Sequence, residues 1–305
     1  YLIKKTMNLI KYTLLLFFFT SCSGSSSNYK PKSSGNINTI TVVMANSLWN
    51  STLGDKVREA FASEFIGLPQ QEPIFNLKQI PLETFSGFTR ESRNIIVVQK
   101  TNKDTLFLEK DKYAYPQVLV SISGRNNNSI SKQIFQNKER VILEIKNNEL
   151  KEKQKRIKIS TLDKTDLKSL LSIELRMPSA YEIYKKGKEK IIWLQRETDK
   201  GTVNILGYEL ETMDFSGPLN LEKVIKIRDS IGKAFLPGRN ENSYMITEEA
   251  YLPYIKKVKI IGLDAIETRG TWEVKNDFMA GPFLNYMIND TINKRTIVLE
   301  GFVFS

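Results

Sequence analysis

Residues 40–65 read ITVVMANSLWNSTLGDKVREAFASEF and contain both kinds of secondary structure that the rest of the chain repeats. The first six residues are mostly β-branched and predict a buried strand. Further on, Val57, Phe61 and Phe65 recur every fourth residue, which predicts a helix over residues 53–65 with one apolar face. A strand joined by a short loop to an amphipathic helix indicates a fold in which helices pack on sheets.

The same patterns continue through the chain in an irregular order. The longest predicted helix covers residues 129–159, and another covers residues 221–235. Strand patterns occur at residues 74–80, 95–100, 105–110, 118–123, 244–248, 256–261, 265–274, 283–288 and 296–304. Because strands and helices do not alternate regularly, we expect an α+β fold with largely antiparallel sheets and packed helices.

Two segments, residues 75–100 and 173–196, have similar patterns. In each, a strand pattern ends at a proline, an aromatic-bearing segment follows, and an apolar strand ends in Gln and a basic residue. A duplication would explain this similarity, and so would convergence of two strand-loop-strand units. We therefore divide the folded part into two α+β halves, residues 39–160 and 161–305, and leave open whether the halves are similar.

The first residues look like a bacterial lipoprotein signal. Residues 7–21 combine Lys11, an apolar run that ends at Phe19, and small residues directly before Cys22, the only cysteine. We expect cleavage before Cys22 and acylation of this residue, which would anchor the protein to a membrane. The alternative is an ordinary signal with an incidental thiol. Residues 22–38 are rich in Ser, Gly and Asn and predict a flexible linker.

Composition excludes several kinds of chemistry. The chain has no histidine, which removes His-containing catalytic triads, His-ligated zinc and imidazole acid–base catalysis. We expect no metal and no cofactor. Lys and Arg number 45 against 34 Asp and Glu, but blocks such as residues 151–156 mix both signs on one predicted helix. We interpret such blocks as solvated helix faces rather than lipid or nucleic-acid patches, and we expect no nucleic-acid partner.

The segment WEVKNDFMAGP, residues 272–282, concentrates an aromatic ring and two carboxylates. Glu273 and Asp277 are four residues apart and would suit a general acid and base acting on a glycan or peptidoglycan. Trp272 would suit a platform on which a sugar or peptidoglycan fragment stacks. The structural interpretation is a Gly-Pro turn between two strands, with Trp272 in the core.

Three further patterns have both a functional and a structural interpretation. Trp49 lies between Asn46 and Asn50 and is either a ligand platform or a loop anchor. The S-x-x-K patterns at residues 129–132 and 230–233 have the spacing at which a lysine activates a serine. Because both patterns lie in predicted helices without companion motifs, we interpret them as ordinary helix residues.

Four separated stretches carry a resemblance to known sequences. They are VVMANSLWNSTLGDKVREAF (42–61), SRNIIVVQ (92–99), GTWEVKNDFMAGPF (270–283) and RTIVLEGFVF (295–304). Together they resemble an uncharacterised lipoprotein family of Bacteroidetes, a domain of unknown function. The resemblance implies an envelope location but no known activity, cofactor or catalytic residue. Members usually continue past the final strand with a helix, so the resemblance also implies a chain truncated at Ser305.

Two further expectations concern the envelope. Asp290, Thr291 and Ile292 resemble the O-glycosylation acceptor pattern of secreted proteins in this group and lie in a predicted hairpin turn, so we predict modification of Thr291. The linker has no acidic cluster of the kind that resembles a surface-export signal. We therefore expect a periplasm-facing protein and leave open which membrane holds it.

Two hypotheses about function remain. In the first, the protein is a noncatalytic lipoprotein that binds or assembles other molecules in the cell envelope. Its partners would be the membrane, through the lipid anchor, and an envelope protein or glycan. In the second, it is a histidine-free envelope hydrolase that acts through Glu273 and Asp277.

Overall fold

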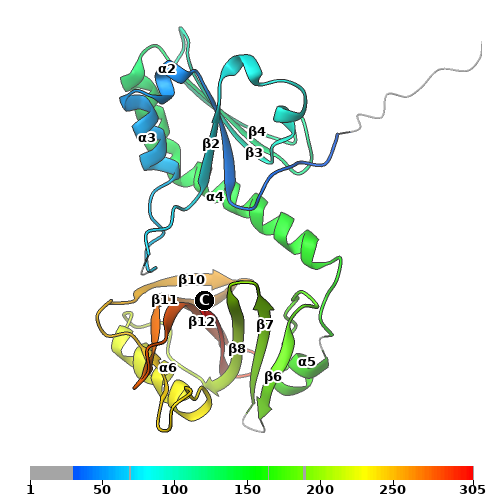
Figure 1. Ribbon diagram of the computed structural model, residues 1–305, viewed down its shortest axis with the longest axis vertical. Helices are drawn as coiled ribbons and strands as arrows, with labels where there is room; N and C mark the ends of the chain where they lie inside the picture. Colours follow the sequence, from blue (N-terminus) through cyan, green and yellow to red (C-terminus); the bar gives the residue numbers. More distant parts are fainter. Residues whose placement is uncertain (1–29, 69, 164, 188–189, 305) are drawn as a thin grey trace, which may run out of the picture.

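The computed structural model describes residues 30–68, 70–163, 165–187 and 190–304, which form two domains (Figure 1). The predicted signal peptide and Cys22 lie outside the described residues. None of the helices in these ranges combines the length and the apolar character needed to cross a bilayer.

The first domain is a five-stranded sheet with its long helices on one face (Figure 1). Its strands run in the order β2-β1-β3-β5-β4, and β1 is parallel to β2 and β3, β3 is parallel to β5, and β4 is antiparallel to β5. The strands are β1 (Thr39–Met44), β2 (Asn76–Ile80), β3 (Asn94–Lys100), β4 (Thr105–Lys110) and β5 (Val118–Gly124). The helices are α2 (Asn46–Trp49), α3 (Thr52–Phe61) and α4 (Asn127–Ile157).

Side chains alternate between the two faces of this sheet. Val42 and Met44 point into the core under the helices, where they meet Val57 of α3. Val43 and Ile95 point to the other face. That face is covered by the segment that contains the short 3₁₀ helices η2 (Leu82–Thr84) and η3 (Gly87–Glu91).

The longest helix, α4, begins with a reciprocal cap. The Asn126 side chain accepts the N–H of Ser129, and the Ser129 hydroxyl accepts the N–H of Asn126. Ile130, Ile134 and Val141 lie on its buried stripe, as the sequence predicts. With 31 residues at 1.5 Å each, the helix is about 46 Å long. It therefore runs past the edge of the first sheet toward the second domain (Figure 1).

The second domain is a strongly curved sheet of eight antiparallel strands (Figure 1). Seven of them run in the order β10-β11-β12-β13-β8-β7-β6, and β9 pairs with β11. Helix α6 (Leu221–Phe235) packs on one face, and α5 (Thr165–Leu171) covers part of the other. The strands are β6 (Glu182–Gly187), β7 (Ile191–Thr198), β8 (Gly201–Glu211), β9 (Tyr244–Thr247), β10 (Tyr254–Ile260), β11 (Leu263–Lys275), β12 (Ala280–Asp290) and β13 (Arg295–Phe304).

The predicted α+β class is confirmed, and the strand pairs of the second sheet are antiparallel. The two halves, however, have different topologies. In the first, β2 and β3 flank β1 and run parallel to it, whereas β6 and β7 form an antiparallel hairpin. The strand pattern predicted to end at the proline of residues 173–196, Pro178, is wrong, because residues 173–177 are irregular. The similarity between residues 75–100 and 173–196 is therefore convergence.

The end of the predicted linker is not flexible but bound to the first domain. The N–H of Ser33 donates to the carbonyl of Tyr115 at 3.0 Å, and the N–H of Tyr115 donates to Pro31 at 2.9 Å. The N–H of Ser34 donates to Glu91 at 2.8 Å. The linker boundary predicted at Asn38 is therefore wrong, and the ordered domain begins by Lys30.

The two domains meet where the loop after α3 contacts β11. The ring centroid of Phe65 lies 4.3 Å from the Arg269 guanidinium and 5.5 Å from the Lys146 ammonium. Gly67 has a φ of +95°, and a Cβ there would lie 2.8 Å from the Cβ of Arg269, so glycine permits this close approach. Burial, with repulsion from Arg269, lowers the pKa of Lys146.

Candidate functional site

Trp272 is a core residue, so its prediction as a binding platform is wrong. Its side chain is 1% exposed, and its indole N–H donates to the carbonyl of Val303 at 3.2 Å. The ring packs edge-on against Phe302, with the ring centroids 6.1 Å apart. A Cβ added at Gly281 would lie 3.0 Å from the indole, so this glycine makes room for the ring. No sugar can reach a tryptophan enclosed in this way.

The alternative catalytic pair, Glu273 and Asp277, is not organised for acid–base chemistry. Glu273 follows Trp272 on β11 and points to the opposite face, where burial and the nearby Glu248 and Glu249 raise its pKa. Asp277 lies in the turn to β12, where its carboxylate accepts the N–H of Phe278 at 2.8 Å. One carboxylate belongs to a strand face and the other holds a turn, so the structural interpretation of this segment is the better one.

Trp49 anchors a loop rather than presenting a free platform. Its ring is partly buried against the first core, and the Arg58 guanidinium lies 4.5 Å from the ring centroid. Asn46 is exposed and accepts a hydrogen bond from Gln79 at 2.9 Å, and Asn50 is also exposed. Trp49 and Trp272 belong to the cores of different domains, so the two tryptophan segments do not form one site.

The serines of the two S-x-x-K patterns have structural roles. The Ser129 hydroxyl caps α4, as described above. The Ser230 hydroxyl donates to the carbonyl of Ile227 at 2.7 Å within α6. Thr291 is exposed in the turn between β12 and β13, and its modification remains a prediction.

A buried ion pair that the sequence did not reveal lies in the second domain. The guanidinium of Arg228 on α6 donates to the carboxylate of Glu300 on β13 at 2.8 Å, and both side chains are buried. Thr247 and Asn285 complete the hydrogen bonds. The space beside this pair has essentially no volume for a ligand. The ion pair therefore fixes α6 on the sheet, and the space beside it does not form a substrate site.

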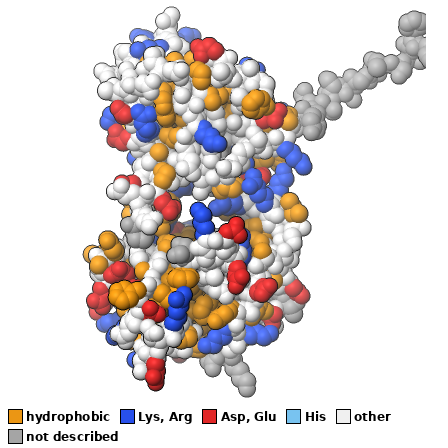
Figure 2. Space-filling model, in the orientation of Figure 1, with side chains coloured by type: hydrophobic (Ala, Val, Ile, Leu, Met, Phe, Trp, Pro, Cys, Tyr) orange, Lys and Arg blue, Asp and Glu red, His pale blue; other side chains and the backbone are white. Residues whose placement is uncertain are grey.

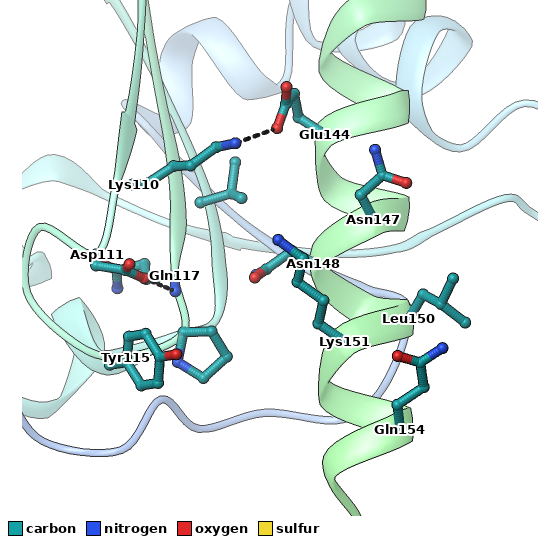
Figure 3. A pocket seen from close by; sticks show the side chains of 12 residues that line it. Lys110, Asp111, Tyr115, Gln117, Glu144, Asn147, Asn148, Leu150, Lys151 and Gln154 are labelled. Carbon is teal, nitrogen blue, oxygen red and sulfur yellow. Dashed lines mark hydrogen bonds and ion pairs between the residues drawn. The ribbon is translucent and has the colours of Figure 1, made fainter. Parts of the chain in front are cut away.

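A polar pocket lies in the first domain, between α4 and the loop that joins β4 to β5 (Figure 3). Its volume is about 450 Å³, within the usual range of small-molecule sites. An ion pair between Lys110 and Glu144, 2.8 Å long, closes one end. Asn148 and Lys151 extend from the helix toward the loop, and Tyr115 lies opposite them (Figure 3).

The loop side of the pocket is held rigidly. Asp111, with a φ of +55°, accepts the N–H of Gln117 at 2.7 Å. The buried Gln117 side chain accepts the N–H of Tyr113 and donates to the carbonyls of Arg90 and Ser92. These bonds connect the loop to the segment before β3, so the pocket wall is preorganised.

The helix side rests on a buried polar network. Glu149 accepts hydrogen bonds from Arg93 at 2.7 Å and from the Asn94 side chain, and the Arg93 and Glu149 side chains are only 1% and 3% exposed. The second Glu149 oxygen accepts the N–H of Asn38, and Arg93 donates to the carbonyl of Asn36. Asn148 joins the network through Asn94 at 3.3 Å and also lines the pocket. One network thus locks the N-terminal segment, β3 and α4 together under the pocket.

The pocket offers several hydrogen-bonding groups to a polar ligand. It presents amides from Asn147, Asn148 and Gln154, which can both donate and accept hydrogen bonds. The hydrogen bond from Lys110 holds the pKa of Glu144 below its ordinary value, so this carboxylate stays ionised and paired. Within the described ranges, no group of three His, Cys, Asp or Glu residues is placed to hold a metal ion.

The sequence did not reveal this pocket, because its residues come from two segments about thirty positions apart and carry no motif. The available signals were the Gly-free polar loop with Pro116 and the amide-rich stretch of α4, including Asn147 and Asn148. Neither signal indicates which segment faces the other, so the pairing required the sheet order.

The fold and this pocket define the chain as a two-domain α+β protein with a polar pocket in its first domain. Residues 33–158 match the model of a domain of unknown function, DUF8532, and residues 160–305 match that of another, DUF4837. The predicted resemblance to an uncharacterised domain family is thus confirmed. Neither a curated protein nor a solved structure matches the chain.

Proposed function

We propose that the protein is a lipid-anchored, noncatalytic binding module of the cell envelope, with Cys22 as the anchor and the pocket beside α4 as the ligand site. The proposal rests on the position of this pocket in the first domain. It lies directly beside Tyr115, to which the chain leading back toward Cys22 is bonded. The described chain therefore enters the first domain beside the proposed ligand site.

The ligand class that fits best is an envelope glycan such as a peptidoglycan fragment. Sugar hydroxyls and acetamido groups need partners that donate and accept, which the pocket amides provide. Tyr115 is 56% exposed at the rim and offers a ring for the apolar face of a sugar. The ionic groups Lys151 and Asp111 at opposite sides would orient a ligand that carries charge.

A titration of the purified protein with soluble peptidoglycan fragments, followed by calorimetry, tests this site. The double substitution Asn147→Ala and Gln154→Ala removes two exposed amides and should weaken binding about fivefold for each hydrogen bond lost. Gln70→Ala with Gln71→Ala removes two exposed amides far along the chain from the pocket and serves as the matched control. Absence of binding, or equal affinity of both double variants, would refute the pocket as the glycan site.

A further inference from the structure

We propose that the surface where the N-terminal segment joins the first domain docks on an anionic phospholipid bilayer. We call it the exit surface and define it by Lys30, Lys32, Tyr115, Lys151 and Lys155. The inference rests on the proposed function, because the lipid anchor is what brings this surface to a membrane. It adds a second, electrostatic contact that fixes how the anchored protein is oriented.

The exit surface is assembled from three segments that the sequence keeps apart. The Lys30 ammonium donates to the carbonyl of Asp111, and Lys32 pairs with Tyr115 in a parallel bridge. The Lys155 ammonium lies 5.8 Å from the centre of the Tyr115 ring, and Lys151 lines the same pocket as Tyr115. Tyr115 is thus the point around which the lysines gather.

Among the residues that the structure describes, the lysines of this surface are not held in ion pairs. In the described part of the chain, Lys30, Lys32, Lys151 and Lys155 are exposed and none forms an ion pair with a carboxylate. The neighbouring Lys110 and Lys112, by contrast, are paired with Glu144 and Glu109. Figure 2 shows blue side chains gathered on the flank below the point where the N-terminal trace leaves the molecule.

This grouping changes the interpretation of residues 151–156. Taken as a helix alone, the block mixes signs, and Arg156 is indeed paired with Glu152 at 2.8 Å. Lys151 and Lys155, one helical turn apart, instead face the side where Lys30 and Lys32 arrive. The fold therefore places the unpaired lysines of this block on one side of α4, apart from the Arg156–Glu152 pair. The sequence alone did not show this separation.

The length of chain before Lys30 limits how far this surface can be from the anchor. Eight peptide units separate Cys22 from Lys30, and a fully extended chain of that length spans at most about 29 Å. An acylated Cys22 would keep the exit surface within that distance of the bilayer and so at a high effective concentration.

Anionic lipids are the partner that matches this chemistry. Clustered, unpaired lysines near an anionic leaflet each strengthen binding about fivefold, which corresponds to about 1 kcal/mol. Attraction of this kind decreases as salt is added, because ions screen exposed charges. A bilayer of neutral lipid would accept the acyl chains of the anchor but would provide no electrostatic contact.

The test uses the mature chain with Cys22→Ser, so that no acyl chain contributes. Its partition onto vesicles of phosphatidylcholine with one-third phosphatidylglycerol is compared, by sedimentation, with partition onto phosphatidylcholine alone. We expect binding to the anionic vesicles, loss of that binding at high salt, and about 25-fold weaker binding for Lys32→Gln with Lys155→Gln. Neither of these two lysines lines the pocket.

The control variant is Lys200→Gln with Lys223→Gln, which removes two exposed lysines from the second domain. It should bind the anionic vesicles nearly as well as the parent. Equal partition onto both kinds of vesicle, or equal losses in the two double variants, would overturn the proposal. These results are distinguishable from a failure of the proposed function, which is measured by acylation of Cys22 and by glycan titration.

Discussion

At the residue scale, the ion pair between Arg93 and Glu149 has the largest structural consequence in the first domain. Both groups are buried, and they connect the N-terminal segment, β3 and α4 through Asn94 and Asn36. A buried charge without its partner is costly, because the low-polarity interior replaces the solvation that water would give. The pair therefore determines the register of three segments that together support the pocket.

Glu149→Gln should lower the free energy of unfolding by about 3 to 5 kcal/mol, because it leaves the Arg93 guanidinium buried without a counter-charge. Urea unfolding followed by circular dichroism measures the change. Glu59→Gln removes the exposed partner of Lys56 on α3, and it should cost less than about 1 kcal/mol. Similar losses in both variants would contradict the structural role assigned to Glu149.

At the element scale, local patterns predicted most helices and strands. The predicted helix over residues 221–235 coincides with α6, whose start is fixed by the Asn220 side chain accepting the N–H of Lys223 at 2.8 Å. Helix α5 was missed because its seven residues are too few for a clear period. The parallel pairing of β1 with β2 and β3 was also missed, since strand patterns do not encode the direction of a partner.

The turn between β10 and β11 contains a residue that its geometry disfavours. Ile260 pairs with Leu263, so Ile261 and Gly262 form a two-residue turn with φ values of +47° and +87°. A β-branched residue at positive φ is strained, and Asn suits the first position of such a turn. Ile261 is also 93% exposed, so it gains little from packing.

Ile261→Asn should therefore stabilise the protein by about 1 kcal/mol. Thermal unfolding would show this as a higher midpoint temperature. Ile292→Asn is the matched control, because Ile292 is 85% exposed in another hairpin turn but is not among the residues with positive φ. A gain of the same size in both variants would mean that lost surface hydrophobicity, not relief of the backbone, is the cause.

At the scale of the whole molecule, two unlike domains are joined by α4 and by the contact of Phe65 with Arg269. The order of strand and helix patterns correctly indicated an α+β protein, but the candidate site was not found from the sequence. Trp272 was singled out for the carboxylates near it and Trp49 for the asparagines that flank it, and such sequence neighbours do not distinguish a core ring from an exposed one. The pocket instead uses common polar residues that become a site only when the loop and α4 face each other.

The central claim is that the protein acts at a membrane to which Cys22 anchors it. The most direct measurement is metabolic labelling of host cells with an alkyne fatty acid, followed by capture of the protein and comparison with Cys22→Ser at matched expression. The account predicts label on the parent protein and none on the variant, because the chain has no other cysteine. Equal labelling of the two proteins, or no label on either, would contradict it.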